Sequence, residues 1–306
     1  GSLKELDLSR ANIVAGGEKY LDTDIISSST GTYTQNNGEN SFHYETEDNV
    51  LGKSLFAGCD KLVKVILPNS LTAIGEYQFW YCLRLKSISI GENVSSIGRQ
   101  LIYGPNKVTN ISVADGNATF SSPANTNLVM EGTKVFLGYG NPTFPAGTTA
   151  IGTEAFSSCN SLGHVTIPEG VTTIEVGAFA WSSLQSISFP STLTTIGNDA
   201  FAGCSNLTSF TLPETVVHYG DGLGALKDCG NLTSISVEKD NPVYDSRDTC
   251  NAIIETYTNT LISGCKNTVI PTSVKIIGYQ PFRGVTLSDY VIPNWITKIG
   301  EMAFWN

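Results

Sequence analysis

The sequence has few charged residues, few histidines and no long hydrophobic run. Charged residues make up 15% of the 306 positions, and 28 acidic against 18 basic residues give a formal net charge of −10. Binding to nucleic acids or to anionic membranes needs a basic surface, so this balance argues against both. No apolar segment approaches the roughly 20 residues of a membrane-spanning helix. We therefore expect no nucleic-acid partner and no transmembrane span in this sequence.

Common catalytic and cofactor motifs are also missing. The three histidines, His43, His164 and His218, belong to no His-Glu-x-x-His motif, and no Gly-x-Ser-x-Gly segment is present. Residues 220–225 match a dinucleotide fingerprint by letter, but they coincide with a repeat glycine and are interpreted as a turn. The sequence thus predicts no catalytic residue, cofactor or metal site. Two carboxylates brought together by folding, as in a glycosidase, stay open as the least favoured alternative.

A repeat dominates what is present. Gly52, Gly75 and Gly98 are spaced by 23 residues, and so are Phe56 and Phe79. The full pattern, Leu-x-x-Ile-x-Ile-Pro and then Gly-x-x-Ala-Phe-x-x-Cys, recurs with variations through residues 51–306. A unit of this length cannot bury its own apolar face, but stacked units bury a continuous core.

Each half of the unit predicts one local structure. Alternating apolar residues indicate a strand with one face inward, and the proline after it ends the strand because it cannot donate a ladder hydrogen bond. Ala-Phe-x-x-Cys places apolar residues at i, i+1 and i+4, which we interpret as one helical turn. The predicted fold is therefore of the α/β class: a β-rich, right-handed leucine-rich-repeat solenoid with short helical turns.

Two units carry insertions that predict β-hairpins. The first joins the runs at residues 128–131 and 134–137, and the second joins those at 253–255 and 260–262. Val113 and Val237 before the hairpins are 124 residues apart, as are Asn117 and Asn241, so a longer block was duplicated. Residues 3–8 predict a first strand and residues 14–50 a polar insertion that caps the stack. We expect residues 1–50 and 51–306 to form one continuous structural domain.

The seven cysteines divide into two groups. Five share the repeat position after Ala-Phe and are interpreted as small buried hydrophobes: Cys59, Cys82, Cys159, Cys204 and Cys229. Cys250 and Cys265 lie on either side of the second hairpin. We hypothesise that these two form a disulfide, with free thiols as the alternative.

The repeat resembles the BspA-like, or Treponema pallidum-type, leucine-rich-repeat family, and residues 251–256 and 259–262 are similar to its gut Bacteroidetes members. The resemblance covers about residues 51–306 and implies a secreted or cell-surface adhesin, often lipid-anchored. The chain starts with Gly1-Ser2 rather than Met, so we expect any signal segment to precede it. Ile102 and Leu226 replace the repeat phenylalanine without threatening the packing.

The outward positions of the strands form a candidate ligand-binding strip. Small polar residues dominate it: Ser87, Ser89, Asn110, Ser112, His164, Thr166, Ser186, Ser188, Ser209, Thr211, Ser234 and Ser236. An alternative is that these residues only solvate the strands, because no aromatic or arginine anchor interrupts them. Trp295 is expected to be exposed in a loop, and Trp181 and Trp305 follow Ala-Phe pairs.

The favoured function is a non-enzymatic surface protein that binds a host protein or another cell through its repeats. The alternative is glycan capture in a polysaccharide-utilisation system, with Trp295 or Trp181 as a stacking platform.

Overall fold

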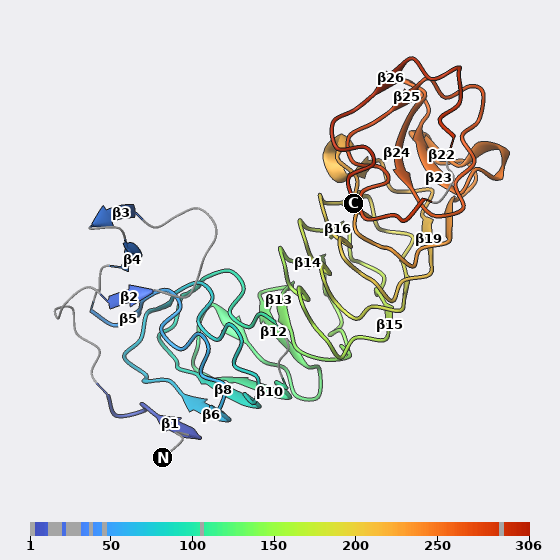
Figure 1. Cartoon of the computed structure of the whole chain (residues 1–306). Coiled ribbons are helices and arrows are strands. Elements are labelled where there is room, and N and C mark those ends of the chain that lie inside the picture. Colours follow the sequence, from blue (N-terminus) through green and yellow to red (C-terminus); the bar gives the residue numbers. More distant parts are fainter. Residues whose placement is uncertain are drawn as a thin grey trace. The chain divides into compact units, whose positions relative to one another are not determined.

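The computed structural model describes residues 4–11, 20–22, 32–36, 39–44, 48–104, 107–287 and 291–306, with backbone alone for residues 20–44. Two compact units are present, unit 1 (Gly1–Ser122) and unit 2 (Pro123–Asn306) (Figure 1). The predicted cap at residues 14–50 lies largely outside the described residues. The single continuous domain stays a prediction.

Unit 1 is built from coils whose strands stack in parallel. One sheet contains the strands β1 (Glu5–Asp7), β6 (Lys64–Ile66), β8 (Ser87–Ile90) and β10 (Asn110–Val113), in that order. A second parallel sheet contains β5 (Val50–Leu51), β7 (Ala73–Ile74) and β9 (Ser96–Ile97). A separate antiparallel sheet has the order β2 (Tyr20–Asp22), β4 (Glu39–Tyr44) and β3 (Thr32–Asn36). β11 (Phe120–Ser121) follows at the end of the unit.

Unit 2 repeats the same arrangement over more coils. Its longer strands pair in parallel as β15 (His164–Thr166) with β17 (Ser186–Ser188), and β19 (Ser209–Leu212) with β21 (Ser234–Val237). The two-residue strands β14 (Ala150–Ile151), β16 (Thr173–Ile174), β18 (Thr195–Ile196) and β20 (His218–Tyr219) pair successively, also in parallel. At the far end, β25 (Ile276–Ile277) pairs with β26 (Lys298–Ile299).

Both predicted hairpins are present in unit 2. β12 (Leu128–Glu131) pairs antiparallel with β13 (Lys134–Gly138), and β13 then pairs in parallel with β14. β23 (Ala252–Glu255) pairs antiparallel with β22 (Tyr244–Asp245) and with β24 (Thr260–Gly264), and β24 continues in parallel to β25. Each hairpin therefore returns the chain to the stack through its second strand.

One asparagine holds the start of each insertion. The Nδ2 of Asn117 donates to the carbonyls of Gly91 and Val94, and its Oδ1 accepts from the amides of Thr119 and Phe120. Asn241 repeats all four bonds with Pro213, Val216, Val243 and Tyr244. The asparagines and the amides that donate to them are offset by 124 residues and the accepting carbonyls by 122, which agrees with the duplication predicted from the sequence.

The repeat phenylalanines form stacks inside the coils. Phe179 lies between Phe156 and Phe201, with ring centroids 5.1 Å and 5.5 Å away and nearly parallel planes. Phe56 and Phe79 stack in unit 1, and Phe282 and Phe304 stack at the end of unit 2. Each coil is thus covered by the coils on either side of it, as the repeat predicts.

The α/β class and the helical turns were wrong. Among the described residues, the only helical segments are two three-residue 3-10 turns, η1 (Gly220–Gly222) and η2 (Arg247–Thr249), so the fold is a β-rich solenoid. The residues two before and two after the repeat phenylalanine have positive φ, for example Glu154 and Ser158 around Phe156. Left-handed residues on both sides cannot continue a right-handed helix.

Hydrogen bonds in this segment also run between coils. The amides of Glu154, Phe156 and Ser158 donate to the next coil, at the carbonyls of Val176, Ala178 and Ala180. The intervening amides of Ala155 and Ser157 donate three residues back, as in β-turns. The Ala-Phe-x-x-Cys segment is therefore a pair of overlapping turns whose backbone joins one coil to the next.

Candidate ligand-binding surfaces

The outward strand positions lie in register. We name the hydroxyl strip by its residues in unit 1, Ser87, Ser89, Asn110 and Ser112, and in unit 2, His164, Thr166, Ser186, Ser188, Ser209, Thr211, Ser234 and Ser236. In unit 1, Ser87 pairs with Asn110 and Ser89 with Ser112. In unit 2, His164 pairs with Ser186 and Ser209 with Ser234, each followed two residues later by a second polar pair.

None of these twelve side chains is buried. Hydroxyls of neighbouring strands bond to one another: Ser112 Oγ to Ser89 Oγ at 3.0 Å, and Thr211 Oγ1 to Ser236 Oγ at 3.0 Å. The Nδ1 of His164 lies 2.7 Å from Ser186 Oγ. These bonds fix the side chains, which are short except for His164, and the exposed Lys64 of β6 borders the strip beside Ser87.

The tryptophans differ from expectation at one position. Trp295 is half-buried and its Nε1 donates to the Pro271 carbonyl at 3.1 Å, so the exposed loop position predicted for it was wrong. Trp181 and Trp305 are instead the exposed tryptophans, at 52% and 53%. Tyr81 holds the position of Trp181 in unit 1 and is 48% exposed.

A polar network near these tryptophans escaped the sequence analysis. Lys227 Nζ lies 2.6 Å from Asp199 Oδ1, and Arg283 Nε lies 3.1 Å from Asp228 Oδ2. The Arg283 guanidinium also lies over the Trp305 ring, 4.5 Å from its centroid. The partners are up to 55 residues apart in the chain, because the second hairpin separates their coils in sequence. Matching residues along the sequence at the 23-residue repeat spacing therefore does not bring these partners together.

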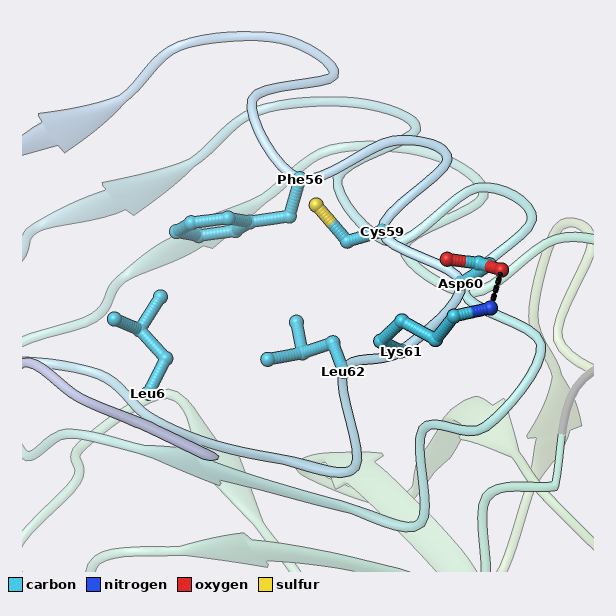
Figure 2. Close-up of a pocket in the computed structure, with 6 residues that line it drawn as sticks. All are labelled: Leu6, Phe56, Cys59, Asp60, Lys61 and Leu62. Carbon is cyan, nitrogen blue, oxygen red and sulfur yellow. Dashed lines mark hydrogen bonds and ion pairs between the residues drawn. The ribbon is translucent and has the colours of Figure 1, made fainter. Parts of the chain in front are cut away.

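Unit 1 contains a small apolar cavity at the end of its phenylalanine stack. Its volume is about 240 Å³, and Figure 2 shows Leu6, Phe56, Cys59 and Leu62 around it, with the Asp60–Lys61 ion pair beside it. The opposite face of Phe56 stacks on Phe79 at 5.6 Å. The cavity is therefore the position where another ring would continue the stack.

The cysteines follow the packing prediction in four of five repeat positions. Cys82, Cys159, Cys204 and Cys229 are buried, whereas Cys59 is exposed because it borders the open cavity. Burial raises the pKa of the Cys82 thiol to about 12 and that of the Cys204 thiol to about 11. These thiols are structural: Cys204 Sγ donates to the Phe179 carbonyl at 3.1 Å.

The proposed Cys250–Cys265 disulfide is not formed in this structure, where both residues are buried free thiols. The two side chains belong to different core clusters. Cys250 Sγ donates to the Ala252 carbonyl and Cys265 Sγ to the Asn251 carbonyl, at 3.7 Å and 3.4 Å. Each thiol thus has its own backbone partner.

Comparison with known families agrees with the coil geometry. A family model described as a BspA type leucine rich repeat region, in six copies, matches residues 29–130, 138–247 and 248–306. The chain belongs to the BspA-type leucine-rich-repeat family. The matched model describes a repeat region rather than a catalytic domain. No curated protein matches the chain.

Several solved structures are similar to this chain. A pneumococcal vaccine antigen, PcpA, is 17% identical with a TM-score of 0.51 over 98% of this chain and 85% of that one. A leucine rich cell surface protein from Faecalibacterium prausnitzii is 22% identical with a TM-score of 0.47, over 99% and 67% of the two chains. The leucine-rich repeat protein of Treponema pallidum is 25% identical with a TM-score of 0.25, over 61% of each chain.

The described part of the chain contains no helix that is long and apolar enough to cross a membrane.

Proposed function

We propose that this protein is a non-enzymatic cell-surface or secreted binding protein that engages a host protein or a neighbouring cell through its hydroxyl strip. The observation that carries the proposal is the register of paired polar residues on parallel strands, with His164 beside Ser186 and Thr211 beside Ser236. Family membership supports it, and one similar structure is that of a protein described as a leucine rich cell surface protein.

The strip suits a partner that lies close to the sheet. Strands of a sheet are about 4.8 Å apart, so the paired columns present hydroxyls at a regular short spacing. Small side chains leave room for a partner's side chains to reach the strand surface. The bonds between strip hydroxyls hold these groups in place before a partner arrives, which reduces the entropy lost on binding.

A binding screen with a steric variant tests this function. The chain is measured against matrix proteins, mucins and whole cells, together with Thr211→Arg, which places a long side chain on the exposed strip. We expect at least one protein or cell partner, and a tenfold or greater loss of affinity in the variant. Tyr257→Arg is the control, because Tyr257 is 94% exposed in the turn of the second hairpin and is not one of the strip residues. Silence across the panel at high protein concentration, or equal binding by Thr211→Arg, would overturn the proposal.

The glycan alternative loses one of its two supports. Trp295 is half-buried with its indole N–H bonded to the Pro271 carbonyl, so it is less accessible to a ligand than the exposed Trp181. Trp181 is exposed.

A further inference from the structure

A second surface of unit 2 lies along the turns that follow the repeat phenylalanines. We name it the turn edge and define it by Trp181, Gly203, Asp199, Lys227, Asp228, Arg283 and Trp305. Backbone hydrogen bonds hold five coils in register here: Trp181 to Ala202, Gly203 to Lys227, Asp228 to Arg283, and Gly284 to Trp305, at 2.6 to 2.9 Å. Trp181 and Trp305 are therefore four coils apart, roughly 19 Å at the spacing of parallel strands.

Trp181 is held in a strained backbone conformation at this edge. Its φ is 59°, in the left-handed region that bulky residues avoid. The same position is glycine in four other coils, at Gly58, Gly104, Gly203 and Gly284. Glycine would remove the strain, so packing of the coil does not require a tryptophan here. Tyr81, Ser158 and Asp228 hold the same position with positive φ, so the backbone conformation belongs to the repeat and the choice of tryptophan does not.

Each of the two tryptophans has one covered face. A Cβ added at Gly203 would lie only 2.3 Å from Cε3 of Trp181, so the indole lies directly on the glycine. The guanidinium of Arg283 covers Trp305. Half of each side chain is nevertheless exposed. Trp181 thus lies on Gly203 with its outer part open to solvent, whereas Trp305 stacks on Arg283 of the preceding coil.

The surface between the tryptophans is polar and electrically balanced. Lys227 pairs with Asp199 and lies 3.4 Å from Gln280 Oε1, and Arg283 pairs with Asp228. Two positive and two negative side chains leave no local excess of either sign. The centre of a protein–protein interface is normally depleted of charged residues, so the turn edge does not have the composition of such an interface.

We propose that the turn edge binds a neutral oligosaccharide, with Trp181 stacking on a sugar ring and the neighbouring Asp199–Lys227 and Asp228–Arg283 pairs bonding to hydroxyls. A pyranose ring has an apolar C–H face and a rim of hydroxyls, which matches an exposed indole beside carboxylate, ammonium and guanidinium groups. The net charge of −10 and the balanced edge disfavour an anionic glycan. This site is separate from the hydroxyl strip, so either proposal can fail alone.

Affinity electrophoresis of the full chain in gels that contain starch, xylan, mannan, a mixed-linkage β-glucan or a sulfated polysaccharide tests the site. We expect retardation by at least one neutral polysaccharide and a tenfold or greater loss of affinity in Trp181→Gly. That variant installs the glycine of four other coils, so its thermal midpoint should not fall; Trp181→Asn, which also tolerates a left-handed backbone, serves as a second variant. Tyr257→Ala removes an exposed aromatic elsewhere and should leave the retardation unchanged.

Three results would overturn the proposal: no retardation by any neutral polysaccharide, retardation only by the sulfated one, or unchanged retardation of both Trp181 variants. Thr211→Arg separates this site from the strip. It should bind the polysaccharide normally while losing the protein or cell partner.

Discussion

At the scale of single residues, Gln78 departs most clearly from the repeat. It occupies the position of the alanine in Ala-Phe, its side chain is 0% exposed, and neither amide atom has a hydrogen-bond partner among the described residues. Equivalent positions hold Leu55 and Leu101 in the neighbouring coils. A buried polar group without a partner loses the hydration energy that it has in the unfolded chain.

Replacement of this glutamine should therefore stabilise unit 1. We expect Gln78→Leu to raise the free energy of unfolding by roughly 1–3 kcal/mol, because leucine fits neighbouring coils and needs no partner. Chemical denaturation measures the change. Gln185→Leu is the control, since Gln185 is exposed and should give little change. A lower stability for Gln78→Leu would mean that its amide is bonded after all.

The thiols allow a second prediction at this scale. All seven cysteines are free, and Cys59 is the exposed one. A thiol reagent should label one thiol in the native, unreduced protein and seven after denaturation. Cys59→Ser should abolish the native labelling. Five reactive thiols after denaturation would instead indicate that two cysteines are bonded, in favour of the Cys250–Cys265 disulfide.

Burial of the thiols also predicts how stability depends on pH. The pKa of the Cys204 thiol and that of the Cys250 thiol are raised from 9.0 to about 11, because burial penalises the thiolate. The unfolded chain therefore releases these protons at lower pH than the folded one. Their contribution is complete below pH 9 and is lost as pH rises toward about 11. Denaturation midpoints across this range should fall, and Cys204→Ala should flatten the decline. A denaturation midpoint that rises with pH in this range would contradict a role of the buried thiols.

At the scale of elements, strands and hairpins could be predicted, whereas the turns could not. Alternation at Ile88 and Ile90 and the proline stops follow directly from strand geometry, and two apolar runs around a polar turn identified both hairpins. The helical interpretation failed because the left-handed positions hold Glu154, Ser158 and Trp181 as well as glycines. Only backbone bonds to the next coil impose that conformation, and sequence spacing does not reveal them.

The insertion asparagines offer a prediction for an element. Asn241→Ala should remove four hydrogen bonds and leave the Val216 carbonyl without its donor, while the Pro213 carbonyl still accepts from the Val216 amide, at a cost of roughly 2–4 kcal/mol. Thermal or chemical unfolding measures it. Asn206→Ala is the matched control, because exposed Asn206 makes one long bond, to the Ser183 carbonyl at 3.4 Å. Equal effects of the two substitutions would show that Asn241 does not hold the hairpin.

At the scale of the whole molecule, the repeat predicted the architecture and the outward strip but not the second surface. The strip follows from strand alternation alone. The turn edge needs Asp228 beside Arg283 and Lys227 beside Asp199, which lie in different coils. Trp295 was misplaced because its loop position suggested exposure, whereas its indole bonds to the preceding coil. The ligand itself cannot be identified from the buried repeat positions, since packing sets those residues.

The central claim is that each coil is stabilised by its neighbours. Native-state hydrogen exchange of Phe179→Ala tests it most directly, because Phe179 stacks between Phe156 and Phe201. We predict that amides in the coils of Phe156 and Phe201 lose most protection, while those of β23 and β24, several coils away, keep theirs. An equal loss of protection throughout unit 2, including β23 and β24, would show a single cooperative core and contradict the account.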